Sequence, residues 1–251
     1  MESTIFEVQG THLKDFDREL YYQFIYFPVE MISFFDFVLK GLYERCFIDN
    51  SHSELNKTER EHRRDKLQVG IKHLHEITDL KSLGPKNINR LISVRGIVIR
   101  ASEVYPDMKM AFFRCTNCRS DLTVALDNAK VQEPTECPTC RIKNSFEIIH
   151  NLCQFTDKQY VKFQELPEYV PDGETPQSMT VICYDNNVDG CRPGDRVELV
   201  GIYRAQSVKV QRIKTNVKSV FNTYVDLISF RILEENRFRS EEAPGKQKFS
   251  D

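Results

Sequence analysis

The sequence lacks any apolar run long enough to cross a bilayer. Its most apolar stretch, Phe24–Leu39, is interrupted by Pro28, Glu30 and Asp36, whereas a transmembrane helix needs about 20 consecutive apolar residues. No basic segment followed by an apolar one opens the chain, so no secretory signal is visible. The eight cysteines therefore indicate a reducing compartment, where paired Cys-x-x-Cys motifs bind metal more often than they form disulfides.

A basic excess and the common catalytic motifs are also absent. Lysine and arginine number 35 against 37 acidic residues, for a net charge of −2, which excludes a uniformly basic nucleic-acid binder. Any binding of nucleic acid must therefore come from a local face. The phosphate loop GxxxxGK[ST] and the patterns GxSxG, HExxH and GxGxxG do not occur. We expect no catalytic residues and no turnover by this chain alone.

The first third of the chain has a helical pattern, from about residue 12 to residue 80. One amphipathic stripe begins near Pro28, a residue tolerated in a first helical turn, and consists of Ile32, Phe35, Leu39 and Leu42. A second helix is predicted over 53–75, with one charged face and one apolar face that carries Leu67, Ile71 and Leu74. We expect both stripes to form the core of a helical bundle.

Beyond residue 84 the sequence changes to short apolar or alternating runs separated by Gly, Pro, Asn and Asp, which predict β-strands. Gly96 and Gly201 lie inside such runs, where glycine permits the sharp coiling of a small barrel. We expect an α+β, mainly β chain whose second part is a five-stranded oligonucleotide-binding (OB) barrel. The predicted strands are Leu91–Arg100, Met110–Arg114, Leu122–Leu126, Phe146–Leu152, Tyr160–Leu166, Met179–Tyr184, Arg196–Arg204, Val208–Gln211, Val217–Phe221 and Tyr224–Leu233.

Four cysteines form the strongest motif. Cys115 and Cys118 make one Cys-x-x-Cys pair, and Cys137 and Cys140 make a second one after an interval of 18 residues. Thiolates at this spacing converge tetrahedrally on one Zn²⁺, which predicts a structural zinc ribbon inserted in the barrel. A closed four-sulfur shell leaves no position for an activated water. A nucleobase deaminase would need Pro before the first cysteine of its pair and an upstream His-x-Glu, but Glu136 precedes Cys137 and no His-x-Glu lies near the cysteine pairs.

The other cysteines and one histidine have plainer interpretations. Cys46, Cys153, Cys183 and Cys191 lie in or beside apolar runs, where a reduced cysteine behaves as a small hydrophobic residue. His150 follows the second cysteine pair by ten residues and is interpreted as an ordinary strand residue rather than as a ligand. A redox function would require both cysteine pairs to go without metal.

A second motif is electrostatic. Between Arg192 and Tyr224 the sequence holds seven basic residues against two acidic ones. Several of them crowd the junction of two short strands, which predicts a basic β-hairpin near 208–221. Such a hairpin suits a phosphate backbone, because each neutralised phosphate releases a counterion; a solvated surface is the alternative. The seven residues are Arg192, Arg196, Arg204, Lys209, Arg212, Lys214 and Lys218.

An acidic segment lies at Glu165–Pro176. It contains three prolines, no basic residue and four acids, which are Glu165, Glu168, Asp172 and Glu174. This composition predicts a stiff, exposed loop. Its residues leave two interpretations open: a long connection of the barrel, or a contact with a partner protein.

Several segments occur in the order found in minichromosome maintenance (MCM) proteins. They are 96–100, 111–115 with the cysteine pairs, 164–165, 193–197 and 201–204. The chain resembles the amino-terminal half of a subunit of this replicative helicase. Residues 216–225, together with the 18-residue interval between the cysteine pairs, most resemble the subunit-four type.

The resemblance implies a nuclear protein of DNA replication whose six homologous subunits form a hetero-hexamer, with two such rings loaded head to head on origin DNA. It implies contacts with single- and double-stranded DNA by the hairpin at 209–218 and by Arg100, Arg192 and Arg204. It also implies a loop that contacts the motor tier through Glu168, Asp172 and Glu174. The cofactor of this chain would be structural Zn²⁺, whereas ATP and Mg²⁺ would bind an ATPase domain beyond residue 251. Neither a membrane nor a small-molecule substrate is expected.

The expected division of the chain is a helical bundle at 1–84, an OB barrel at 85–114 and 146–238, a zinc ribbon at 115–145 and a linker at 239–251. Two other functions remain open from the residues alone. One is a freestanding zinc-ribbon OB protein for single strands or RNA, and the other is an assembly module that touches only proteins.

Overall fold

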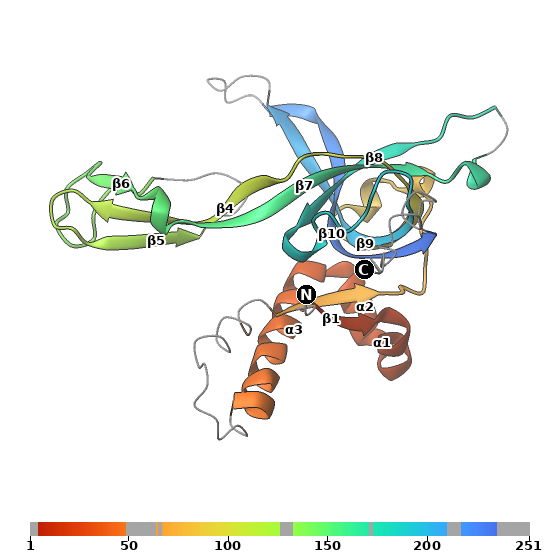
Figure 1. Cartoon of the computed structure of the whole chain (residues 1–251), viewed down its shortest axis with the longest axis horizontal. Coiled ribbons are helices and arrows are strands. Elements are labelled where there is room, and N and C mark those ends of the chain that lie inside the picture. Colours follow the sequence, from red (N-terminus) through yellow and green to blue (C-terminus); the bar gives the residue numbers. More distant parts are fainter. Residues whose placement is uncertain are drawn as a thin grey trace, which may run out of the picture. The chain divides into compact units, whose positions relative to one another are not determined.

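The structure of the protein is a computed structural model (Figure 1). It describes residues 5–48, 64, 67–125, 133–170, 173–209 and 217–234. The chain divides into two compact units, one formed by Met1–Ser102 together with Tyr160–Asp251 and the other by Glu103–Gln159. Among the helices that the described residues form, none has the length and apolarity needed to span a membrane.

Three helices lie near the amino terminus of the first unit: α1 (Gly10–Phe16), α2 (Arg18–Tyr26) and α3 (Pro28–Tyr43), with a π-helical turn at Glu44–Ile48. The Asp17 carboxylate caps α2 by accepting the N–H of Glu19 at 2.8 Å, which satisfies a donor that the first helical turn leaves open. The helix predicted from Pro28 is confirmed as α3. Its residues Ile32 and Phe35 pack on the core as expected, but Leu42 is half exposed.

Two short strands flank the helices and correct the sequence prediction. β1 (Ile5–Gln9) and β2 (Gln68–Lys72) pair in parallel from Ile5↔Gln68 to Gln9↔Lys72. The predicted helix over 53–75 is therefore wrong at 67–75, where 68–72 form a strand, while 53–63 and 65–66 lie outside the described residues. The apolar spacing suited a helix, but Val69 and Ile71 are β-branched, and pairing with a strand far away in the sequence determines their conformation.

Helix α3 and strand β2 are joined by a polar contact. The Asp36 carboxylate accepts the N–H of Val69 at 2.7 Å, so a side chain of α3 satisfies a backbone donor of β2. Burial raises the pKa of Asp36, an effect that this hydrogen bond and the nearby charge of Lys40 only partly offset.

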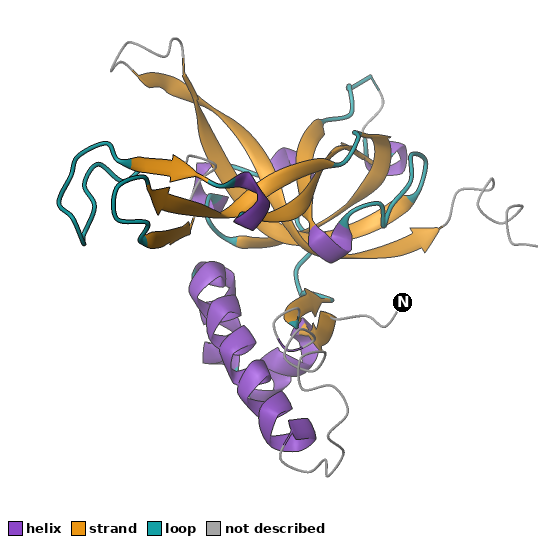
Figure 2. Cartoon of the chain, turned by 60° about the vertical axis from the view of Figure 1, so that its left-hand side comes forward, coloured by secondary structure: helices purple, strands orange, loops and turns teal. Residues whose placement is uncertain are grey.

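Eight further strands form one sheet (Figure 2). The pairings β3–β9, β9–β10, β10–β8, β8–β7 and β7–β3 form a closed circuit of five strands, and β4, β5 and β6 extend it. The predicted strands are confirmed over most of the positions that the structure describes, with two pairs of them merged into the long β9 and β10, but the strand predicted at Phe146–Leu152 ends at Ile148 and a 3₁₀ turn, His150–Leu152, follows it. The strands are β3 (Leu91–Ala101), β4 (Tyr105–Cys115), β5 (Asp121–Ala125), β6 (Phe146–Ile148), β7 (Gln154–Glu165), β8 (Ser178–Tyr184), β9 (Arg196–Lys209) and β10 (Val217–Glu234).

Side chains alternate between the two faces of the five strands, so residues of these strands belong to two separate apolar cores. One face of each strand points into the circuit and fills it with the residues Ile92, Val94, Val98, Val161, Phe163, Met179, Val181, Cys183, Val197, Leu199, Tyr203, Val225 and Leu227. On the opposite face of β3 and β9, Leu91, Val200 and Ile202 pack against Tyr21 and Phe24 of α2. The helices therefore cover an outer face of the sheet.

Two glycines allow the strands of the circuit to approach one another. Gly96 pairs with Glu165 of β7 and with Val197 of β9, so it lies where β3 contacts both neighbours. A Cβ atom at Gly96 would collide with the carbonyl oxygen of Gln164 and lie 2.6 Å from Phe163 Cζ. A Cβ atom at Gly201 would lie 2.5 Å from the carbonyl oxygen of Asp226.

Replacing Gly96 by alanine should lower the free energy of unfolding by about 2–3 kcal/mol, because the methyl group forces β3 away from β7. Gly84→Ala is the matched control: an added Cβ there meets nothing within 4 Å, and the backbone φ of −122° suits alanine. We expect the control to change stability by less than about 0.5 kcal/mol in urea titrations. Equal effects of the two variants would contradict the close approach at Gly96.

Candidate metal centre and nucleic-acid interface

The second unit consists of β4, β5, β6 and the first half of β7, and it positions the four motif cysteines. Strand β4 pairs with β5 from Met110↔Ala125 to Arg114↔Asp121 and ends at Cys115, whose neighbour across the pair with β6 is Phe146. Phe113 and Phe146 form an edge-to-face pair beside the buried sulfurs. A small apolar core thus holds the base of the cysteine site.

Both Cys-x-x-Cys motifs fold into the same local turn. In the first, Arg119 N–H donates to the carbonyl oxygen of Cys115 at 3.0 Å, and in the second, Arg141 N–H donates to that of Cys137 at 2.9 Å. Arg119 and Arg141 both adopt the left-handed conformation, with φ of 58° and 56°. Each turn points its two sulfurs to the same side, so local chain geometry prepares each half of the site.

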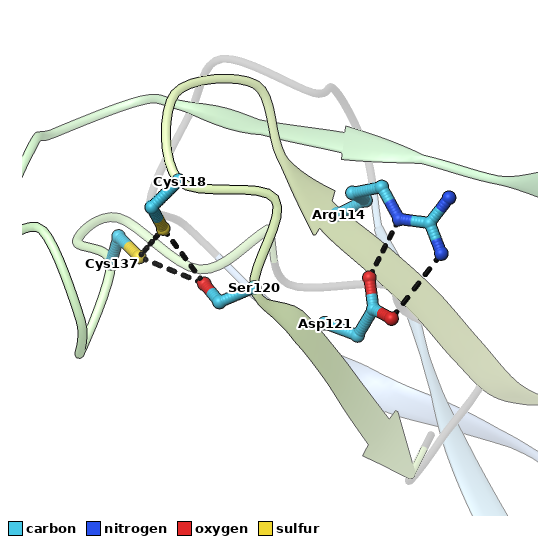
Figure 3. A network of polar contacts seen from close by, with 5 residues as sticks. All are labelled: Arg114, Cys118, Ser120, Asp121 and Cys137. Atoms are coloured by element: carbon cyan, nitrogen blue, oxygen red, sulfur yellow. Dashed lines mark hydrogen bonds and ion pairs between the residues drawn. The ribbon is translucent and has the colours of Figure 1, made fainter.

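The two turns bring four sulfur atoms together, and Figure 3 shows two of them, those of Cys118 and Cys137. All four Sγ atoms lie within 4.8 Å of one another, and the pairs Cys115–Cys140 and Cys118–Cys137 are each 3.6 Å apart. A tetrahedral Zn²⁺ site with Zn–S bonds of about 2.3 Å has sulfur–sulfur edges of about 3.8 Å. The thiol cluster therefore fits one zinc ion, and its donor chemistry matches a structural site.

The surroundings of the thiols shift their pKa values in opposite directions. The backbone N–H of Cys140 and the Ser120 hydroxyl lower the pKa of Cys137 to about 6, and the N–H of Cys118 with the Ser145 hydroxyl lowers the pKa of Cys115. The Ile142 N–H also favours the Cys140 thiolate, yet burial and the neighbouring sulfurs raise the pKa of Cys140 to about 11. A dication would relieve this crowding of negative charge.

Ser120 and Ser145 are site residues that the sequence prediction missed. Ser120 Oγ lies 3.1 Å from Cys118 Sγ and 3.3 Å from Cys137 Sγ (Figure 3). Ser145 Oγ lies 3.3 Å from Cys115 Sγ. The available signal was a hydroxyl residue two positions after Cys118. Beside it, the Arg114 guanidinium forms a two-point ion pair with Asp121 at 2.7 and 3.2 Å, across the β4–β5 pair.

The remaining cysteines are not members of the thiol cluster. Cys183 and Cys191 are buried in the core of the circuit, where desolvation raises the pKa of Cys183 to about 12. The small-hydrophobe interpretation is confirmed for these two and wrong for Cys46, which is exposed. His150 is exposed in a short 3₁₀ helix, His150–Leu152, rather than in a strand.

Two of the predicted DNA contacts lie on segments that hydrogen bonds hold together. Arg100 is exposed near the end of β3, and Arg192 is exposed in the turn before β9. This turn is fixed to β3, because Val98 exchanges backbone hydrogen bonds with Asp195 at 3.0 Å and with Gly194 at 2.7 Å. The buried Asp195 carboxylate also accepts the Arg192 N–H at 2.9 Å.

The third predicted arginine has a different environment. Arg204 is half-buried, and its Nε lies 2.5 Å from the carboxylate of Asp226 on the neighbouring strand β10. Its charge is therefore compensated within the chain.

The arms of the predicted basic hairpin are β9 and β10, which pair antiparallel as far as Lys209 and Val217. Arg212 and Lys214 lie outside the described residues, and the structure describes Lys209 and Lys218 by their backbone alone. The position of the arms agrees with the sequence prediction, and the structure leaves their side-chain contacts untested.

The acidic segment contacts the rest of the first unit through ion pairs. Glu168 lies 2.8 Å from Arg196, and Glu174 pairs with Lys81, while Asp172 lies outside the described residues. The expectation of an exposed segment is wrong for Glu165, which is 5% exposed. Glu165 ends β7 on the inward-facing side of the alternation and lines a cavity of about 160 Å³ with Arg95 and Tyr169.

Comparison with known proteins identifies the family. Residues 79–207 match the family model described as the MCM OB domain. The chain belongs to the MCM family. It contains an OB-fold domain, its described part has mostly β structure, and the family resemblance read from the sequence is confirmed.

Three relatives, each described as a DNA replication licensing factor of the MCM4 type, cover most of the chain. The chain is 36% identical over 242 residues, 96% of its length, to the protein of Drosophila melanogaster, and 35% identical over 246 residues, also 96%, to that of Arabidopsis thaliana. It is 37% identical over 223 residues, 88% of its length, to the protein of Schizosaccharomyces pombe. The chain spans about a quarter of these curated relatives, 27%, 27% and 24% of their lengths.

The thiol cluster predicts the metal content of the purified chain. We expect about one zinc per chain by elemental analysis, and a loss of most of it in Cys137→Ser, because three thiolates form an open and weaker site. Cys153→Ala is the control, since Cys153 lies in the same unit but contacts the Phe112 N–H and not the other sulfurs. A chain that folds without metal, or equal zinc loss in both variants, would contradict the site.

Proposed function

We propose that this chain is the amino-terminal tier of an MCM replicative helicase subunit of the subunit-four type, and that it acts in the nucleus in replication licensing and origin unwinding. The observation that carries the proposal is a basic site built on an MCM OB domain. Arg100 and Arg192 are both exposed. Backbone hydrogen bonds to Val98 hold the turn of Arg192 against β3, the strand that carries Arg100. A tier of this kind binds and encircles DNA, and no residue of it has a catalytic role.

The architecture that we infer for this tier has three parts. The closed circuit of five strands would be the OB barrel, with the β9–β10 arms as the basic hairpin. The unit of Glu103–Gln159, with its thiol cluster, would be the zinc ribbon inserted in that barrel. Helices α1, α2 and α3 would form the helical bundle that covers the outer face of β3 and β9.

Zinc would have a structural role in this tier. Cys115, Cys118, Cys137 and Cys140 would occupy all four coordination positions, so the ion would order the ribbon and would not activate water. The Ser120 and Ser145 hydroxyls would hold two of the sulfurs as thiolates and orient them. The ribbon would thereby become a rigid unit suited to contacts between two rings.

DNA binding by this tier would be electrostatic. The basic residues on β3, on the Arg192 turn and on the hairpin arms would neutralise phosphates and release counterions, which requires no base-specific contact. A chain with a net charge of −2 would bind weakly by itself. Six related subunits around a channel would act multivalently, so a hetero-hexamer gains affinity without a basic protein overall.

The acidic segment would contact the motor tier, in which ATP and Mg²⁺ bind. The carboxylates of Glu168 and Glu174 are 60% and 57% exposed although each has an ion-pair partner, so both remain accessible to a basic partner surface. Asp172 would add a third negative charge to this loop. Surface ion pairs of this kind contribute about 1 kcal/mol or less, so they would exchange readily for contacts with the motor.

The basic site predicts how substitutions change the binding of a fluorescent single-stranded oligonucleotide. Arg100→Ala and Arg192→Ala should each weaken binding and lower the slope of log K against log salt by about 0.7, the value for one phosphate contact. Arg231→Ala is the control of equal charge change, because Arg231 pairs with Glu198 at a separate place. The hairpin substitutions Lys209→Glu, Arg212→Glu and Lys214→Glu, combined, should reduce affinity and slope most.

Arg204 offers an internal comparison for the same titration. Because Asp226 compensates its charge, Arg204→Ala should change the salt slope less than Arg192→Ala does. Unchanged binding in both the Arg192 and the hairpin variants would contradict DNA contact and would favour a tier that touches only proteins.

Assembly with related subunits is a second test. Mixing the chain with the amino-terminal tiers of other MCM subunits should give complexes of up to six chains in native mass spectrometry, because the tier is one segment of a ring. A chain that binds DNA but never associates with the related subunits would instead be a freestanding OB protein.

A further inference from the structure

Helix α3 has a second apolar stripe on the side away from the core. Ile32 and Phe35 pack inward, whereas the solvent-facing side carries Phe34, Phe37, Val38 and Leu42, which are 60%, 76%, 39% and 50% exposed. Spacings of three and four residues align these side chains along one side of the helix. Soluble monomers seldom expose contiguous apolar patches of this kind unless they bind something. We name these four residues the outer stripe.

A glycine interrupts the outer stripe. Gly41 lies on the same side of α3 as Phe34, Phe37 and Val38, since an α-helix turns by about 100° per residue. Glycine inside a helix is destabilising compared with alanine. A Cβ atom at Gly41 would meet nothing within 4 Å, so the packing of this chain does not require the glycine. Its effect is a notch in an exposed apolar surface, which allows another helix to approach closely.

The outer stripe is complementary to itself. When two copies of α3 run antiparallel about a twofold axis between Phe37 and Val38, Phe34 of each copy lies opposite Gly41 of the other. Phe37 then faces Val38, and the exposed Glu30 faces the exposed Arg45 just beyond the end of the helix. A twofold contact requires this reciprocity, in which residue i meets residue j in both directions.

We propose that the outer stripe of α3 is a contact surface between two copies of this chain, packed antiparallel with Phe34 of each copy in the notch at Gly41 of the other. The contact uses neither the thiol cluster nor the basic site, so it stands independently of the proposed function.

The size of the stripe sets the expected strength of the contact. A buried aromatic side chain removes roughly 150–250 Å² from water, so the exposed parts of the stripe give on the order of 400 Å² per copy. Interfaces below about 1,200 Å² in total belong to weak and transient complexes. We therefore expect reversible association at micromolar or higher concentration.

Sedimentation equilibrium of the full chain over about a hundredfold range of concentration tests the contact. A phosphine reductant keeps the exposed Cys46 from forming disulfides. The wild-type chain should associate to a dimer, and Phe37→Asp should weaken association at least about tenfold, as expected for an apolar residue at the centre of an interface. Phe16→Asp is the control, because Phe16 is an exposed phenylalanine of α1 outside the stripe.

A second variant separates loss of the contact from loss of folding. Gly41→Leu fills the notch while improving helix propensity, so thermal stability of the monomer should be kept or increased. Association should fall about tenfold, because Phe34 of the partner copy loses its place. Gly41→Ala, with a smaller group, should give an intermediate effect.

Charge reversal tests the antiparallel arrangement. Glu30→Arg and Arg45→Glu should each weaken association about threefold, since each places like charges at both ends of the contact. The double variant should recover, as should an equal mixture of the two single variants. Within one helix these residues are about 22 Å apart, beyond the screening length at physiological salt, so recovery can arise only between copies.

Three results would overturn the proposal. A wild-type chain that stays monomeric at all concentrations would leave the stripe to a different protein. Association that persists in Phe37→Asp and in Gly41→Leu would place the contact elsewhere on the chain. A charge-reversed pair that associates no better than the single variants would exclude the antiparallel register.

Discussion

The closure of the strand circuit at β3 is the constraint on which the rest of the first unit depends. Gly96 pairs with Glu165 of β7 on one side and with Val197 of β9 on the other, and a Cβ atom there would collide with Gln164 and Phe163 of β7. Because β3 is held on both sides, the hydrogen bonds of Val98 can fix the turn that carries Arg192. The same closure directs Glu165 inward, beside the core. The basic site and the acidic segment thus both follow from one strand contact.

Several arginines of this chain are neutralised by a nearby carboxylate. Glu198 is buried and accepts hydrogen bonds from Arg95 at 2.9 Å and from Arg231 at 3.3 Å, so two arginines of the sheet serve one carboxylate. Asp226 compensates Arg204 in a similar way. Breaking such partly buried pairs leaves an uncompensated charge, which costs more than forming them gains. In this nearly neutral chain, a local positive surface therefore forms where arginines such as Arg100 and Arg192 reach solvent.

Helix α3 has one side that packs on the core and an opposite side that is exposed. Its inner side is fixed by the contact of Phe35 with Phe24, with ring centroids 4.7 Å apart, and by the hydrogen bond from Val69 N–H to Asp36. These contacts leave the opposite side with exposed phenylalanines and a glycine that the fold itself does not use. An apolar surface on a rigid helix is well suited to association, because little conformational entropy remains to be lost on contact.

The sequence by itself determined the features whose physics is local. Each Cys-x-x-Cys turn forms within a few residues, so the spacing of the cysteines sufficed to predict that they form one cluster. The alternating and apolar runs of β3 to β10 are visible residue by residue, so most of these strands were predicted from the sequence. Only the tertiary structure decided the features that depend on distant partners. Residues 68–72 form a strand because β1 pairs with them. Glu165 is buried because it lies on the face of β7 that points into the circuit. Arg204 is neutralised because β10 brings Asp226 beside it. The spacing of apolar and charged residues along the chain does not show which distant segments will pair, so it could not reveal these contacts.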